Sequence, residues 1–304
     1  MRPTKTTTTS QLLLGAAGRA LGVTADALDS AVRGLENARR VANFLRGRME
    51  FRVRASDVFI SSYPRSGTTL TQWILYLLTH EEQPDPEHLT KVSPWFERSL
   101  AIGELTAGDL ERFASPRVFK SHLPREWLPD GARYIYVERD PKDVLVSYFH
   151  FYRSYLGFHG SFDDFYRRFM EGRVQYGSWF DHVSSWRKRS TDPDVLLVRY
   201  EDLLSDRKAS IRRIVDFLGW ERDERWIDRA VIESGFDAMK RRESVFDHAT
   251  ALLLERGVSQ RTFLRAGLSG GAANEISEAQ AREIRERSST GHRPAIRRLS
   301  AFLQ

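Results

Sequence analysis

The sequence predicts an α/β fold, in which helices flank a central, mostly parallel β-sheet. From Asp57 onward, short apolar runs each lead into a turn and then into a helix-like stretch, which is the pattern of repeated βα units. The helical stretches between these runs begin and end at residues that favour helix termini. A chain of 304 residues, of which 41% are hydrophobic, is also long enough to bury one sizeable core.

Four apolar runs are predicted to be strands, because each is short and each is followed by polar or charged residues. They span residues 58–61, 118–120, 134–137 and 195–198. In an open α/β sheet, ligands bind outside the carboxyl ends of the strands. The polar residues that follow each run are therefore candidate site residues by position alone.

Two of the predicted helices have clear boundaries. One follows the third strand, with Asp140 as N-cap and Pro141 in the first turn, and is expected to run through Phe151. The other spans about 208–218 and is closed by Gly219, the residue that most often follows a helix.

Residues 1–50 are predicted to form an N-terminal helical extension, and residues 51–304 one domain, because apolar positions in the first segment recur at loosely helical spacing. Arg19, Asp26 and Asp29 interrupt its most apolar stretch, which is too short for a membrane helix or a secretory signal. The expectation is a cytoplasmic protein without a transmembrane segment.

The composition narrows the classes of partner. A net charge of +6 favours an anionic ligand, but Lys and Arg alternate with Asp and Glu and no base-reading module appears, which argues against nucleic acid. The absence of cysteine excludes disulfides, thiolate metal sites and a cysteine nucleophile, and fits a reducing compartment. No metal site is predicted.

The segment from Ser61 to Thr69 lies between the first strand and a helix, where backbone N–H groups and a helix N-terminus converge on an anion. The Walker A pattern would place glycine where Ser62 stands and lysine where Thr68 stands, so a nucleoside triphosphate site is disfavoured. Arg65 supplies positive charge from an earlier position. The alternative is a structural strand-to-helix turn with Ser and Thr caps.

Three further strand ends carry candidates. Lys120 ends the second strand and His122 follows it, and a neutral histidine there can take a proton from a hydroxyl group near neutral pH. Arg139 ends the third strand and has the planar fork that suits a phosphate, with Ser147 on the next helix. Tyr200 ends the fourth. The alternatives are a structural histidine, a surface arginine beside a capping Asp140, and a packing tyrosine.

Together these segments resemble the cytosolic-type sulfotransferase family over roughly 57–271. The segment 63–69 is similar to the family's 5'-phosphosulfate loop, and 139–143 through Ser147 is similar to its 3'-phosphate motif. The resemblance implies a P-loop-like sulfotransferase fold with a mobile C-terminal segment over the donor. It also implies transfer of a sulfuryl group from 3'-phosphoadenosine 5'-phosphosulfate (PAPS) to a hydroxyl or amine, leaving adenosine 3',5'-bisphosphate (PAP).

The resemblance assigns roles residue by residue. His122 takes the position of the general base, with Lys120 and Arg65 as the other catalytic residues. The residues that it implies for donor binding are Arg65, Ser66, Gly67, Thr68, Thr69, Arg139, Ser147, Tyr200, Ser234, Phe236, Arg265 and Gly267.

The chain departs from the family pattern at several positions. Arg65 replaces a lysine, Leu70 replaces an aromatic residue, and Ala266 replaces a cation near the 3'-phosphate. The usual dimer motif is not present, because Ala273, Glu278 and Arg282 stand where it requires lysine, valine and glutamate. A monomer, or a dimer built on another surface, is therefore expected.

The acceptor stays open among a phenol, an alcohol, a lipid and a glycolipid headgroup. Six aromatic residues are candidates for an apolar acceptor pocket, with core packing as the alternative: Trp95, Phe96, Tyr155, Phe158, Trp179 and Phe180. Two rival functions are a nucleotide-dependent kinase and a non-catalytic module that binds PAPS or another polyanion.

Overall fold

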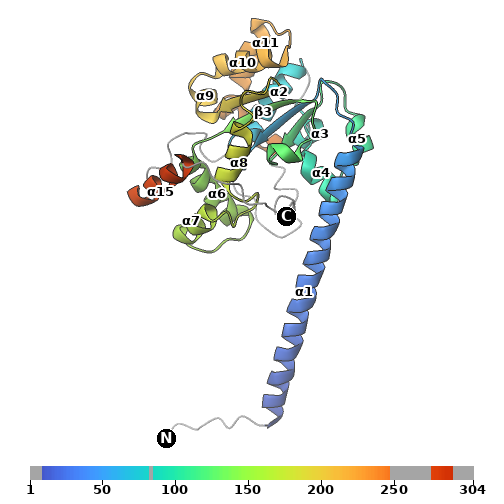
Figure 1. Ribbon diagram of the computed structural model, residues 1–304, viewed down its shortest axis with the longest axis vertical. Coiled ribbons are helices and arrows are strands. Elements are labelled where there is room, and N and C mark those ends of the chain that lie inside the picture. The colour runs from blue at the N-terminus through green and yellow to red at the C-terminus, as the bar shows by residue number, and fades with distance from the viewer. Residues whose placement is uncertain (1–8, 82–84, 247–274, 290–304) are drawn as a thin grey trace.

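A computed structural model of the chain describes residues 9–81, 85–246 and 275–289. Its centre is a four-stranded sheet in the order β2-β1-β3-β4, with every neighbouring pair parallel (Figure 1). The strands are β1 (Val58–Ser62), β2 (Val118–Ser121), β3 (Arg133–Glu138) and β4 (Val195–Arg199). The predicted fold class is confirmed, and each predicted strand is one residue longer at its carboxyl end.

Helices and one 3-10 turn connect and flank the strands. They are α1 (Thr9–Glu50), α2 (Thr68–Thr79), α3 (Leu89–Val92), α4 (Phe96–Ile102), α5 (Ala107–Glu111), η1 (Arg125–Trp127), α6 (Pro141–Tyr155), α7 (Phe162–Met170), α8 (Trp179–Arg187), α9 (Tyr200–Ser205), α10 (Arg207–Leu218), α11 (Glu224–Glu233), α12 (Phe236–Arg241), α13 (Glu243–Phe246) and α15 (Glu278–Ser289). Of these helices, none has both the length and the apolar composition needed to cross a membrane.

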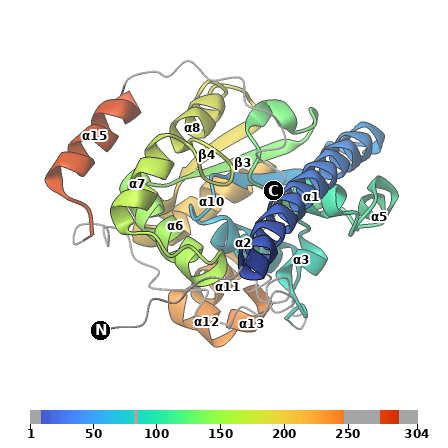
Figure 2. The same cartoon turned by 90° about the horizontal axis from the view of Figure 1, so that it is seen from below.

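Both faces of the sheet are buried, as a parallel sheet requires. Successive side chains of a strand point to opposite faces, so Phe59 joins an aromatic core with Phe119 and Tyr134, whereas Ile60 joins a mainly aliphatic core. The first core lies under α4, α6, α7 and α8, and the second under α2, α10 and α11. Figure 2 shows α11, α12 and α13 gathered on the side of α2.

The two helices with clear sequence boundaries form as predicted, with one difference in length. Asp140 caps α6 by accepting a hydrogen bond from the Lys142 N–H at 2.8 Å. The helix continues one turn beyond Phe151 to Tyr155, which is buried. Gly219 ends α10 in the left-handed conformation, with φ of 66°.

The helix α1 projects from the sheet and its flanking helices, and within the described residues its last turns pack against α4 and α5 (Figure 1). Phe44 is fully buried and meets the ring of Phe96 edge-on at 6.3 Å between centroids. Farther from the sheet, Leu28 and Leu35 are exposed. The division of the chain at residue 50 stays a prediction.

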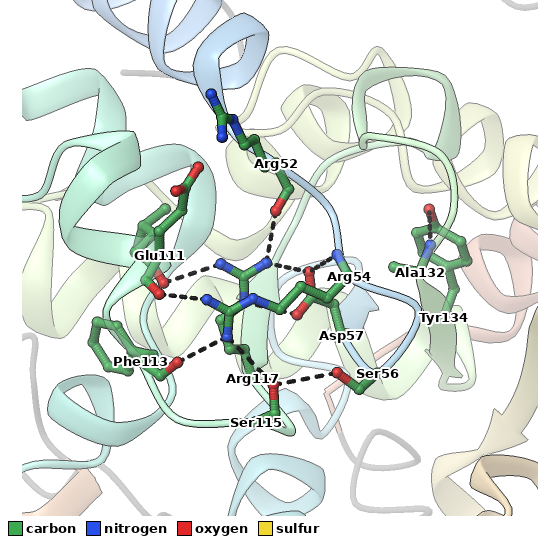
Figure 3. Close-up of polar contacts among 11 residues, drawn as sticks. Arg52, Arg54, Ser56, Asp57, Glu111, Phe113, Ser115, Arg117, Ala132 and Tyr134 are labelled. Carbon is green, nitrogen blue, oxygen red and sulfur yellow. Dashed lines mark hydrogen bonds and ion pairs between the residues drawn. The ribbon is translucent and has the colours of Figure 1, made fainter.

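A buried ion pair fixes the amino ends of β1 and β2 (Figure 3). Arg117 and Asp57 have fully buried side chains, and two nitrogen–oxygen contacts of 2.7 and 2.6 Å join them. Arg117 also donates to the Arg52 carbonyl at 2.8 Å, which ties the segment after α1 to the sheet. This network lies at the opposite end of the strands from the candidate site.

Candidate active site

The loop between β1 and α2 has a backbone that needs glycine. Gly67 has φ of 101° and stands at the N-cap of α2, and Arg65 also lies in the left-handed region with φ of 69°. A Cβ atom on Gly67 would lie 2.4 Å from Cδ2 of Tyr200. The absence of a side chain therefore lets the loop pass directly against the tyrosine that begins α9.

The first and third strand ends are joined by their arginines. Nε of Arg65 donates to Oγ of Ser147 at 3.2 Å, and Nη1 of Arg139 donates to the Arg65 carbonyl at 3.0 Å. The Arg139 guanidinium also lies 4.5 Å from the centre of the Tyr200 ring. Four residues that the sequence placed at three strand ends thus form one cluster.

This cluster has the electrostatics of an anion site. Removal from water and repulsion by Arg139 lower the pKa of Arg65 to about 10. Within the described part of the chain, Oγ of Ser66 is buried and has no hydrogen-bond partner. A bound dianion would offset the repulsion between the two guanidinium groups and accept a hydrogen bond from this hydroxyl.

Lys120 is 4% exposed at the end of β2. Its Nζ lies 3.9 Å from the centroid of the Trp95 ring, in cation–π geometry. Burial lowers the pKa of Lys120 to about 7, and the negative charge of Glu97 partly offsets that effect. The lysine can therefore change its charge near neutral pH.

His122 is held in the form that a general base needs. Its Nδ1 lies 2.8 Å from the Ser62 carbonyl, which can only accept, so Nδ1 carries the proton and Nε2 keeps its lone pair. Burial and the charge of Lys120 lower the pKa of His122 well below its ordinary value. The rings of Trp95 and Tyr176 lie edge-on to the imidazole at 5.1 and 5.2 Å between centroids.

The remaining predicted residues fall into three groups. Thr68 and Thr69 open α2, and Oγ1 of Thr68 lies 2.6 Å from Oγ of Ser62. Ser234 follows α11 and Phe236 begins α12, beside α2, where the Trp73 indole donates to the Glu233 carbonyl at 2.9 Å. Arg265, Gly267 and the dimer-motif position Ala273 lie outside the described residues.

Comparison with known proteins identifies the family. The sequence model of the sulfotransferase domain matches residues 55–291. The chain belongs to the sulfotransferase family. The expected resemblance to its cytosolic-type members is confirmed: sulfotransferase 4A1 of Mus musculus is 36% identical over 232 residues, covering 72% of this chain and 78% of the relative. Sulfotransferase 1 family member D1 of Mus musculus is 34% identical over 249 residues, covering 78% of this chain and 83% of the relative.

Solved structures show the same fold around the donor product. Mouse sulfotransferase SULT7A1 complexed with PAP has a TM-score of 0.64 and 26% identity, covering 82% of this sulfotransferase and 88% of that chain. Retinol dehydratase, in complex with androsterone and the inactive cofactor PAP, has a TM-score of 0.67 and 25% identity, covering 81% of this sulfotransferase and 84% of that chain. This sulfotransferase is a PAPS-dependent enzyme, and its paired arginines and buried Ser66 hydroxyl suit such a donor.

Some residues beside His122 were not found from the sequence. Tyr176 has φ of 63°, unusual for a residue other than glycine, and the neighbouring Gly177 carbonyl accepts from the Tyr63 hydroxyl at 2.7 Å. Glu97 accepts a hydrogen bond from the His122 backbone N–H at 2.8 Å. No sequence pattern marks Glu97, which stands between Phe96 and Arg98.

Only part of the predicted aromatic pocket lies at the site. Trp95 contacts His122 and Lys120. Phe96, Trp179 and Phe180 are buried in the aromatic core, as the core-packing alternative expected.

Proposed function

We propose that this sulfotransferase moves a sulfuryl group from PAPS to a hydroxyl, or an amine, of a small-molecule or lipid acceptor, with His122 as general base. The observation that carries this proposal is the hydrogen bond between Nδ1 of His122 and the Ser62 carbonyl. It places Nδ1 at the end of β1, where the phosphate loop begins, and leaves Nε2 unprotonated and basic. A base so placed contributes about 10² to 10⁴-fold to a proton transfer.

Other residues bind the donor and offset its charge. When bound, PAPS supplies an electrophilic sulfuryl group on a leaving phosphate. Arg65 and Lys120 offset the negative charge that develops there, as cations do in phosphoryl transfer. Arg139 and Ser147 hold the 3'-phosphate, while Ser66, Gly67, Thr68 and Thr69 hold the 5' side. Tyr200, Ser234, Phe236, Arg265 and Gly267 complete the proposed donor site.

The surroundings of His122 support an acceptor with an apolar body and one nucleophilic group. The rings of Trp95 and Tyr176 both lie beside the imidazole and stack on each other with centroids 6.3 Å apart, so the surroundings of His122 are aromatic and apolar. Two similar structures contain androsterone or retinol, which are apolar alcohols. A cytoplasmic location for this chemistry stays a prediction.

The test is a screen of phenols, aliphatic alcohols, sterols and amines with PAPS in the presence of a metal chelator. Equal amounts of PAP and sulfated product are expected for at least one acceptor. Binding of PAPS without turnover of any acceptor would favour the non-catalytic binding module. In a parallel assay without chelator, turnover that requires ATP and magnesium in place of PAPS would favour the kinase.

A further inference from the structure

At the outer edge of β2, a side-chain carboxylate accepts a backbone hydrogen bond that a neighbouring strand would otherwise accept. The Lys120 N–H donates to the Pro94 carbonyl at 2.9 Å, and Trp95 pairs with Lys120 as a short parallel bridge. In a parallel ladder the next outward N–H, that of His122, would bond to the carbonyl of residue 96. Because α4 begins at Phe96, the chain leaves the ladder there, and Oε1 of Glu97 accepts the His122 N–H at 2.8 Å instead.

The same oxygen also fixes Trp95. The indole Nε1 donates to Oε1 of Glu97 at 2.6 Å, so one atom orients both the backbone of His122 and the ring against Lys120. Glu97 is fully buried, and within the described residues its Oε2 has no hydrogen-bond partner. Burial therefore raises the pKa of Glu97, although its donors oppose that shift.

A neutral glutamine could accept the same two hydrogen bonds. Placing a carboxylate in the interior carries a larger desolvation penalty than placing a neutral amide there. Packing and hydrogen bonding alone therefore do not explain why this residue is a glutamate. An electrostatic interaction with Lys120 does explain it. Of the charged groups that shift the pKa of Lys120, Arg98 and Arg65 lower it and Glu97 raises it.

We propose that Glu97 is a positioning residue for sulfuryl transfer: one carboxylate oxygen orients His122 and Trp95, and its negative charge attracts the Lys120 ammonium toward that indole. This inference rests on the proposed function, because it takes His122 as the base and Lys120 as a catalytic cation. Glu97 itself touches neither the donor loop nor the acceptor in this account. It acts through the residues that do.

Two substitutions separate the geometric part from the electrostatic part. Glu97→Gln keeps an acceptor oxygen but removes the charge, whereas Glu97→Asp keeps the charge but withdraws the oxygen by one methylene. We expect Glu97→Asp to lower kcat by up to about 10²-fold, the effect of a misplacement of about 1 Å. We expect Glu97→Gln to lower the pKa of Lys120 below about 7, because the attraction that raises it is lost.

The pKa of Lys120 can be followed without turnover, by NMR of protein labelled with ¹⁵N-lysine. The signal is assigned by its loss in Lys120→Arg. In the kinetic assay, with 4-nitrophenol as the acceptor probe, the alkaline limb of kcat/KM for PAPS should move to lower pH in Glu97→Gln only. A shift of the alkaline limb distinguishes a positioning role of Glu97 from a merely structural one. If Glu97 were only structural, Glu97→Gln would lower the melting temperature but leave the alkaline limb at the same pH.

Glu104→Gln is the matched control, since it removes the same charge from an exposed position seven residues away. It should match the unmodified enzyme in all assays. The inference would be overturned if the titration midpoint of Lys120 were unchanged in Glu97→Gln, or if kcat were unchanged in Glu97→Asp. If one of these variants does not fold, the other is sufficient for the test. Retained sulfuryl transfer in His122→Ala would instead overturn the assignment of His122 as the base in the proposed function, so the two failures are distinguishable.

Discussion

Nε of Arg65 donates a hydrogen bond to Oγ of Ser147 across 82 residues of sequence, at 3.2 Å. The contact links the loop proposed to hold the 5' side of the donor to the helix proposed to hold its 3'-phosphate. Because Arg139 also donates to the Arg65 carbonyl, the two phosphate sites share one set of side chains. Changes at either site should therefore affect binding of the whole nucleotide.

PAP is expected to stabilise the protein against heat far more than adenosine 5'-monophosphate does. A ligand that binds only the folded state adds about 2.7 kcal/mol to the free energy of unfolding at 100 times its Kd. The monophosphate lacks the 3'-phosphate that Arg139 and Ser147 are proposed to hold. Melting curves with each nucleotide at matched concentrations check this, and equal shifts would contradict the assignment.

Arg139→Ala should weaken PAP binding by roughly tenfold or more, since a charge-assisted hydrogen bond contributes about 1.5 to 3 kcal/mol. The acceptor KM should change much less. Calorimetric titration with PAP measures the effect, and Arg153→Ala, an exposed change on the helix α6 that follows Arg139, is the control. Unchanged affinity would return Arg139 to a role in capping and packing.

Gly67→Ala should reduce PAP affinity sharply, because the new methyl group would lie 2.4 Å from Cδ2 of Tyr200. The loop must move to relieve this contact. Gly103→Ala is a matched control, as Gly103 also has positive φ, 76°, but nothing lies within 4 Å of the added atom. Both variants should lose stability through backbone strain, and only Gly67→Ala should lose nucleotide binding by calorimetry.

The sheet could be predicted from sequence because its signal is local. Each strand is a short apolar run, and burial on both faces makes such runs nearly continuous, as at Val58 to Ile60. The C-terminal end of α6 was harder to predict from the sequence. The helix extends to Tyr155, whose side chain is buried in the tertiary structure. The residues near Phe151 give no sequence signal of that burial.

The candidate site was predictable only where its residues end strands. Arg65, His122 and Arg139 follow the ends of β1, β2 and β3, and parallel strands bring their carboxyl ends to one edge. Glu97 and Tyr176 reach the site from other segments. Their contacts depend on a backbone N–H and on a left-handed conformation, neither of which leaves a pattern in the sequence.

Arg117→Leu should lower the free energy of unfolding by about 3 to 5 kcal/mol, because it leaves the Asp57 carboxylate buried and unpaired. Replacing both residues with leucine should recover part of that loss, since no buried charge then remains. Denaturant titrations of the single and double variants check this. Arg112→Leu, which breaks an exposed pair with Asp109, should change stability little. A small effect of Arg117→Leu would mean that water reaches Asp57.

His122→Ala should leave PAP binding nearly intact while lowering turnover by about 10² to 10⁴-fold, because it removes the proposed base but no proposed donor contact. The loss should be smaller for a phenol than for an aliphatic alcohol, since a phenol gives up its proton more easily.

The direction of the pKa shift of His122 provides a second check of its role. Because the pKa of His122 lies below its ordinary value of 6.5, the base stays neutral at pH 6.5, and the acid limb of the pH–rate profile of the unmodified enzyme should lie below that pH. Calorimetry and pH–rate profiles measure both effects. Near-normal turnover of an alcohol by His122→Ala would leave His122 as a structural residue.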